Sequence, residues 1–235
     1  MPDSQPHCYL FTALPCEAKP LIAYFKLKKE LSVTAFTVYR NAGITLTVTG
    51  LGKAAMAAGV AYTFALYPSV RLAVVLNIGV AGHKDFELGT AFVAEKISDK
   101  GTGRHYYPQL LTTPPWATHP VTTVSRAELN YAADCLYEME ASAFYETAAR
   151  FSSSELIHSI KLISDNQQNP STQVTAVQIS AWINDALPML DQYRQQLIQI
   201  ASEIPLIEVC YYAEISEQWR FSSQEKRQLK SLLSK

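Results

Sequence analysis

Two carboxylates flank one thioether in the segment Glu138-Met139-Glu140, and small and aromatic residues follow it through residue 149. The run predicts a tightly packed helix with both acids in its first turn, where carboxylates favour the positive end of the helix dipole. Met139 indicates that the acids also contribute to a binding site, because an apolar side chain buried between two acids places at least one acid at the edge of a cavity. A carboxylate beside an apolar surface suits a neutral polyol such as a sugar diol.

Two further acids stand where predicted strands end. Glu17 follows an apolar strand at residues 8–14 and precedes a helix, and Asp165 follows a buried strand at residues 156–163. In open α/β sheets, ligands bind at the carboxyl ends of strands. Serving a helix N-terminus is the alternative role for Glu17. The acids become a site only if the fold brings them together.

Glycines follow two other predicted strands. Gly50 and Gly52 lie between a strand at residues 44–49 and a helix at 54–66, and Gly79 and Gly82 form a predicted turn at residues 77–82 after a strand at 72–76. Such glycines let backbone N–H groups approach a ligand. Neither stretch is a phosphate-binding loop or a dinucleotide-binding fingerprint.

The remaining pattern alternates strands with helices, which favours an α/β fold with a largely parallel or mixed sheet. The other predicted elements are a hairpin of residues 34–39 with 44–49, strands at 89–97 and 121–124, a partly helical stretch at 125–137, and an amphipathic helix at 175–202 that Pro188 interrupts.

Size and charge narrow the class of protein. The chain has 235 residues, 48% of them apolar, and a formal net charge of −1, which predicts one domain and no nucleic-acid or anionic-membrane partner. Its four cysteines include no closely spaced pair, so we expect free thiols. With no apolar leader and no run of membrane-spanning length, a cytoplasmic protein is predicted.

Four segments in order now support a resemblance. Residues 49–53, 77–82, 138–141 and 163–165 are similar, in order and approximate spacing, to the motifs of the nucleoside phosphorylase/nucleosidase superfamily, and the similarity spans residues 9–201. The resemblance implies a three-layer α/β/α sandwich around a mixed, partly barrel-like sheet, assembled as a homodimer or larger homo-oligomer. Residues 1–235 are then one domain, with 203–235 as a C-terminal helical extension that covers an edge or forms a subunit interface.

The resemblance also implies a catalytic pair. Glu17 stands where the nucleosidases have the carboxylate that activates water, and Asp165 matches the acid that protonates or hydrogen-bonds the departing purine. Cleaving an N-ribosidic bond leaves positive charge on the sugar and negative charge on the base, so one acid must supply a proton while a carboxylate positions the nucleophile. We therefore expect Asp165 to reach the reaction protonated and Glu17 to have an ordinary or lowered pKa.

The substrate-binding residues follow from the same resemblance. Met139 and Glu140 match the pair that contacts the ribose, Ser164 would steady Asp165, and Lys161 stands where the family often has an arginine near the nucleophile. The implied binding set is Glu138, Met139, Glu140, Ser164, Lys161, Gly79 and Val80.

Departures from the family pattern leave three functions open. Asn77 and Val80 occupy positions where the hexameric purine phosphorylases hold phosphate with an arginine and a hydroxyl residue, which favours water as the nucleophile. Val80 departs from the nucleosidases as well, and the segment 121–138 is shorter than the family's base-binding segment. The hypotheses are an N-ribosyl hydrolase acting on a purine nucleoside, a phosphate-dependent phosphorylase, and a nucleoside-binding protein with weakened catalysis. No metal or cofactor is expected, and phosphate enters only as co-substrate of the second.

Overall fold

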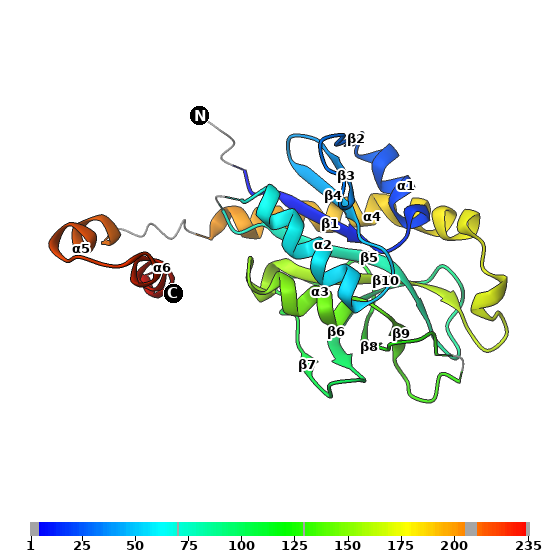
Figure 1. The fold of residues 1–235 in the computed structure, drawn as a ribbon. Helices are drawn as coiled ribbons and strands as arrows, with labels where there is room; N and C mark the ends of the chain where they lie inside the picture. Colours follow the sequence, from blue (N-terminus) through cyan, green and yellow to red (C-terminus); the bar gives the residue numbers. More distant parts are fainter. Residues whose placement is uncertain (1–4, 70, 129, 205–210, 234–235) are drawn as a thin grey trace. The chain divides into compact units, whose positions relative to one another are not determined.

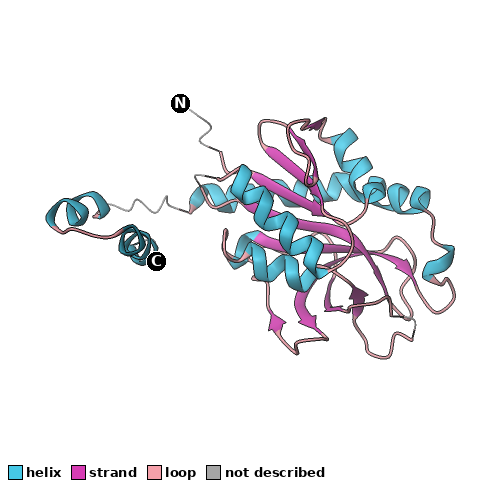
Figure 2. Cartoon of the chain, in the orientation of Figure 1, coloured by secondary structure: helices cyan, strands magenta, loops and turns pink. Residues whose placement is uncertain are grey.

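The chain divides into two compact units, Met1–Ser202 and Glu203–Lys235. The computed structural model describes residues 5–69, 71–128, 130–204 and 211–233. The first unit is an α/β structure with helices on both faces of a mixed sheet (Figures 1 and 2). The described part of the second unit contains α5 (Tyr212–Gln218) and α6 (Ser223–Leu233).

Strand β5 (Val74–Gly82) joins an open sheet to a closed barrel. On its open side the strand order is β1 (Cys8–Thr12), β4 (Ile44–Val48), β3 (Thr37–Arg40) and β2 (Lys28–Lys29). On its other side the order is β10 (Ile157–Asp165), β6 (Ala91–Asp99), β8 (Thr118–Thr123) and β9 (Leu136–Glu138), with β7 (His105–Tyr106) paired to β6. Because β9 and β10 both pair with β5, the barrel is closed, and it consists of β5, β10, β6, β8 and β9. The predicted α/β fold with a mixed, partly barrel-like sheet is confirmed.

Helices cover the sheet of the first unit. Helix α2 (Lys53–Leu66) packs against α3 (Ala141–Ala148) on one face, and α1 (Pro15–Tyr24) and α4 (Ala176–Glu203) lie elsewhere around the sheet (Figure 1). Short 3-10 turns occur at Ser154–Leu156 and Ser171–Gln173. Helix α4 buries one apolar stripe, including Ile183, Leu187 and Leu190, so its amphipathic pattern is explained by packing on the core.

Strands β1, β5 and β10 run parallel and end at one edge, where the antiparallel strand β9 also meets β5. Strand β1 runs parallel to β5 with Phe11 opposite Asn77, and β10 runs parallel to β5 with Asp165 opposite Gly82. The short strand β9 meets the same end of β5, where Tyr137 pairs with Gly82. The residues that follow these strands therefore converge although they are far apart in sequence.

Three of the predicted elements are wrong. Residues 77–82 are not a turn but continue β5, because they pair along the length of β10. Residues 125–137 contain no helix in their described part and end in β9, which pairs with β5 and β8. Pro188 does not interrupt α4, which continues through it between the buried Leu187 and Leu190.

The described cysteines Cys8, Cys16 and Cys135 are free, as predicted, and Cys210 lies outside the described residues. No helix among the described residues combines the length and the apolar character needed to cross a membrane.

Candidate active site

Glu17, Glu140 and Asp165 line one hollow. Its volume is about 540 Å³ including the part open to solvent. The predicted residues Glu138, Met139, Val80 and Ser164 line it as well. The three acids come from α1, from the residue before α3 and from the end of β10. The fold thus brings the three acids together, which the predicted site requires.

Glu17 both caps α1 and faces the hollow. Its Oε2 accepts hydrogen bonds from the N–H groups of Ala13 (2.9 Å) and Leu14 (2.8 Å), and its Oε1 accepts one from Val80 (3.2 Å). The two roles proposed for Glu17 are therefore compatible, since one carboxylate oxygen serves the helix start and the other points toward β5. Gly79 leaves room for it, because a Cβ there would lie 3.1 Å from Glu17 Oε1 and 3.5 Å from Lys161 Nζ.

The pKa of Glu17 differs from the expected ordinary or lowered value. Burial raises its pKa to about 7, and the charge of Glu140 acts in the same direction. The Leu14 N–H and the Lys161 ammonium lower the pKa but do not offset burial. That expectation was wrong because Glu17 is 2% exposed, and burial removes most of the solvation that stabilises a carboxylate charge.

Glu138 and Lys161 form a buried ion pair. Lys161 Nζ lies 2.8 Å from Glu138 Oε2, and each side chain is 1% exposed. The same Oε2 accepts the N–H groups of Glu140 (2.9 Å) and Ala141 (2.7 Å), and Oε1 accepts the Thr123 hydroxyl (2.5 Å). Burial raises the pKa of Glu138, but Lys161 and the hydrogen bonds outweigh it and the net shift is downward. Glu138 is thus an ionised carboxylate, and both of its oxygens already accept hydrogen bonds from other groups of the protein.

The two acids of the Glu138-Met139-Glu140 segment do not lie in a first helical turn. Glu138 ends strand β9 and Glu140 is the residue that precedes α3. Glu140 Oε1 accepts the Gly52 N–H (2.7 Å), which ties the first glycine turn to the site. Burial, followed by repulsion from Glu138, raises the pKa of Glu140. Met139 is partly buried between them and lines the hollow, as predicted.

Asp165 is held by two hydroxyl groups. Ser164 donates to its Oδ1 (2.5 Å) and Tyr131 donates to its Oδ2. The placement of Ser164 beside Asp165 was predicted, but Tyr131 was not. Tyr131 lies within the stretch expected to be partly helical, and no local pattern marks it; only the tertiary fold brings it to Asp165.

Two residues of the predicted binding set do not line the hollow, among the residues described. Lys161 is paired to Glu138 beneath it, and Gly79 faces Glu17 and Lys161 from within β5. Their positions give them structural roles. The residues missed by sequence reasoning include Tyr131 and Thr123, which hold Asp165 and Glu138, respectively. The backbone N–H of Gly52, which the glycine pattern placed near a ligand, binds Glu140.

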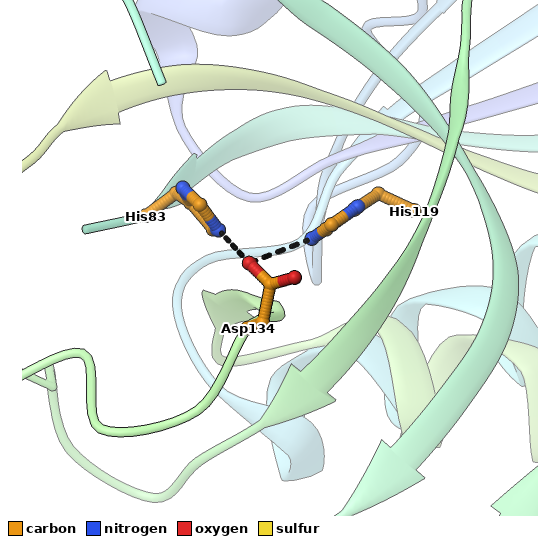
Figure 3. A group of neighbouring side chains, drawn as sticks. All are labelled: His83, His119 and Asp134. Carbon is orange, nitrogen blue, oxygen red and sulfur yellow. Dashed lines mark hydrogen bonds and ion pairs between the residues drawn. The ribbon is translucent and has the colours of Figure 1, made fainter. Parts of the chain in front are cut away.

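Among the described residues, His83, His119 and Asp134 present ligand atoms within 4.8 Å of one another (Figure 3). The hydrogen bonds of His83 do not suit a metal. Its Nδ1 accepts the N–H groups of Asp85 and Phe86 at 3.2 Å each, so in the neutral ring the proton is on Nε2, which donates to Asp134 Oδ1 (3.2 Å). A metal-binding histidine normally donates from its other nitrogen. We therefore interpret His83 and Asp134 as a hydrogen-bonded pair, with His119 Nε2 lying 3.9 Å from Asp134 Oδ1.

No protein-family model and no curated protein matches the chain. Solved structures, in contrast, match the chain over most of its length. The chain is 12% identical to 5′-methylthioadenosine nucleosidase of Arabidopsis thaliana, with a TM-score of 0.67, and the match covers 86% of this chain and 98% of that one. The methylthioadenosine/S-adenosylhomocysteine nucleosidase of Colwellia psychrerythraea, solved with adenine, is 19% identical with a TM-score of 0.61, covering 80% and 96%.

The chain has the nucleosidase fold. A third structure, the nucleosidase of Chlamydia trachomatis bound to methylthioadenosine, matches at 18% identity and a TM-score of 0.61, with 80% and 99% covered. The structural similarity to these nucleosidases, at low sequence identity and high coverage, confirms the fold that the resemblance implied.

The buried pair yields a stability prediction. Lys161→Met leaves the Glu138 carboxylate buried without its counter-ion, which should lower the free energy of unfolding by about 3–5 kcal/mol. Lys84→Met is the matched control, because Lys84 and its partner Asp85 are 37% and 67% exposed, and it should change stability by less than about 0.5 kcal/mol. Urea denaturation measures both. Equal stability of the two variants would show that the pair does not hold the site together.

Proposed function

We propose that this protein hydrolyses the N-ribosidic bond of a purine nucleoside or a close derivative. The observation that carries the proposal is the convergence of Glu17, Glu140 and Asp165 on one hollow. The nucleosidase fold and the structures solved with adenine and methylthioadenosine support this substrate class.

In the proposed reaction, water attacks the anomeric carbon of the ribose and the carbon–nitrogen bond to the base breaks. Glu17 takes the proton that the water loses, and Asp165 gives a proton to the departing base. A pKa of about 7 suits Glu17 to this task, since a general base works best when its pKa is near the operating pH. Water and nucleoside yield free ribose or its derivative and the base.

The sugar is proposed to lie against Met139 and Glu140. Glu140 can accept hydrogen bonds from the ribose hydroxyls, while the thioether of Met139 packs on the apolar face of the ring. Glu138 is a positioning residue, because its carboxylate is bound by Lys161 and by the N–H groups of Glu140 and Ala141.

The charge of the hollow favours water over phosphate. Its lining, among the described residues, includes Glu17, Glu128, Glu138, Glu140 and Asp165 and contains no lysine or arginine. Glu128 and Glu138 are paired with Lys100 and Lys161 and Asp165 is the proposed proton donor, so Glu17 and Glu140 supply the negative charge. A phosphate anion would meet repulsion there without a cation to bind it. The same negative field stabilises the positive charge that develops on the ribosyl group as the bond breaks. Phosphorolysis is therefore the weaker candidate.

Phosphate dependence tests the choice of nucleophile. We expect purified protein to release free base from adenosine, inosine or methylthioadenosine in phosphate-free buffer, with no increase when phosphate is added. Chromatography of base and sugar products measures the reaction. Release only with phosphate, yielding a sugar 1-phosphate, would establish the phosphorylase instead. Tight binding of every nucleoside without release would support the binding-protein hypothesis.

Substitution of the two catalytic acids tests their roles. Asp165→Asn and Glu17→Gln should each lower kcat on the order of 10²–10⁴-fold, because each removes one proton-transfer group. Asp185→Asn, an exposed acid on α4, is the matched control and should retain turnover. Circular dichroism verifies that the variants fold. Near-normal turnover in folded Asp165→Asn would remove Asp165 from the mechanism.

The raised pKa of Glu17 predicts the pH profile. The carboxylate is present above a pH of about 7 and is lost below it, so kcat/KM should fall about tenfold per pH unit on the acid side. The stability effect has the opposite sign: the contribution of protonated Glu17 to folding is fully present below pH 4.5 and is lost as the pH rises through about 7. Rate profiles and denaturation at several pH values measure both. An acid limb centred near pH 4.5 would contradict the assignment.

A further inference from the structure

One segment beside the hollow inserts a single side chain into the molecule. Of the described residues from 125 to 134, Tyr131 alone is buried, at 3% exposure. The ring packs with Val124, Cys135 and Tyr137, and Met139 lies against the same cluster. Val124, Tyr137 and Met139 also line the hollow. Tyr131 therefore lies directly beyond the lining residues, on the side where Asp165 is found.

The Tyr131 ring occupies the space in front of Gly82 and Asp165. Its hydroxyl donates to Asp165 Oδ2, and a Cβ on Gly82 would lie 2.6 Å from its Cε1. The ring can approach this closely only because residue 82 is glycine. Burial and the nearby Asp165 charge raise the pKa of the Tyr131 hydroxyl, so it stays protonated and remains a donor.

A leaving base that takes a proton from Asp165 must reach one of its oxygens. Both oxygens are already bound, Oδ1 by Ser164 and Oδ2 by Tyr131. Ser164 lies in β10, whose residues are all buried, whereas Tyr131 belongs to a segment whose other described residues are more exposed. Oδ2 is therefore the oxygen at which a base and a protein side chain compete.

We propose that Tyr131 occupies the base subsite and that the base binds by displacing it from Asp165 and Gly82. This inference rests on the proposed function and identifies the ligand of that subsite. A planar heteroaromatic base with a ring nitrogen at its edge can replace the phenol, because it fills the same flat space over Gly82 and offers a partner to Asp165 Oδ2. Tyr131 is then a specificity-determining residue, because only a base whose contacts with Asp165 and Gly82 are at least as favourable as those of Tyr131 can displace it.

The backbone and the neighbouring contacts of Tyr131 are consistent with displacement. Tyr131 has a φ of +44°, a left-handed conformation that is unfavourable for a residue with a side chain of this size. Farther along the segment, Asp134 is held by His83 (Figure 3), but the Asp134 side chain is 70% exposed. The His83 side chain is 1% exposed, so this hydrogen bond is only half open to water. The segment is also held by the Lys100–Glu128 ion pair and by the hydrogen bond from the Ala133 N–H to the Tyr137 hydroxyl, and displacement of Tyr131 requires a local shift of its backbone rather than loss of these contacts.

The first experiment removes the competing hydroxyl and keeps the ring. Tyr131→Phe should bind adenine or hypoxanthine about tenfold more tightly than the unmodified protein, because a hydrogen bond to a carboxylate no longer opposes the base. Tyr131→Ala, which also removes the ring, should bind at least as tightly as Tyr131→Phe. Titration calorimetry gives the affinities. The matched control is Tyr193→Phe, which deletes a buried hydroxyl bonded to His158 instead and should leave the affinity within twofold.

The second experiment follows Tyr131 itself. Nitration of exposed tyrosines by tetranitromethane, read by peptide mass spectrometry, should spare Tyr131 in the free protein and modify it when adenine saturates the site. Tyr107, which is 61% exposed, reports reagent reactivity in the same sample. This readout requires no turnover.

The outcomes separate this inference from the proposed function. Tighter base binding by Tyr131→Phe together with base-induced nitration supports displacement, even if no nucleoside is cleaved, in which case only the hydrolase proposal fails. Unchanged or weaker binding by Tyr131→Phe overturns the inference and makes Tyr131 a positioning residue for Asp165. Continued protection of Tyr131 in adenine-saturated protein overturns it as well, as does the absence of base binding by all three proteins.

Discussion

A single buried ammonium group organises the acidic centre of this molecule. Lys161 pairs with Glu138, and Glu138 in turn binds the N–H groups of Glu140 and Ala141 at the start of α3. Glu140 and Glu17 lie close enough to Lys161 to affect its pKa: burial lowers it, but these carboxylates and Glu138 raise it overall. One cation thus faces three carboxyl groups, and the excess negative charge is what gives the hollow its chemical character.

Two glycines on β5 make this concentration of charge sterically feasible. At Gly79 a side chain would meet Glu17 and Lys161, and at Gly82 it would meet Asp165 and Tyr131. Both positions lie in the part of β5 that pairs with β10. Because β5 belongs to the open sheet at one end and to the closed barrel at the other, its central position brings α1, β9 and β10 to the same place.

Burial gives the acids different properties although their chemistry is similar. The Lys161 pair holds Glu138 ionised, whereas Glu17 and Glu140 lack a direct counter-ion and their pKa values rise. This difference divides the tasks of structural support and proton transfer. It also produces a hollow that repels anions and favours a substrate whose reacting centre becomes positive. The Tyr131 hydroxyl donates to Asp165, the acid that we propose protonates the leaving base.

The amino-acid sequence by itself determined the α/β class and most strand positions, and it singled out the acids that the structure brings to one hollow. Strand-end carboxylates and the Glu138-Met139-Glu140 segment are local patterns that singled out Glu17, Asp165, Met139 and Glu140, and the resemblance to the nucleosidases added Ser164 and the expected role of each residue. The tertiary structure decided that residues 77–82 form a strand, that residues 125–137 contain no described helix, and that Tyr131 reaches Asp165. It also decided the raised pKa of Glu17. The physical reason is the same in each case: barrel closure, desolvation and charge depend on neighbours supplied by distant parts of the chain, which a local pattern does not contain.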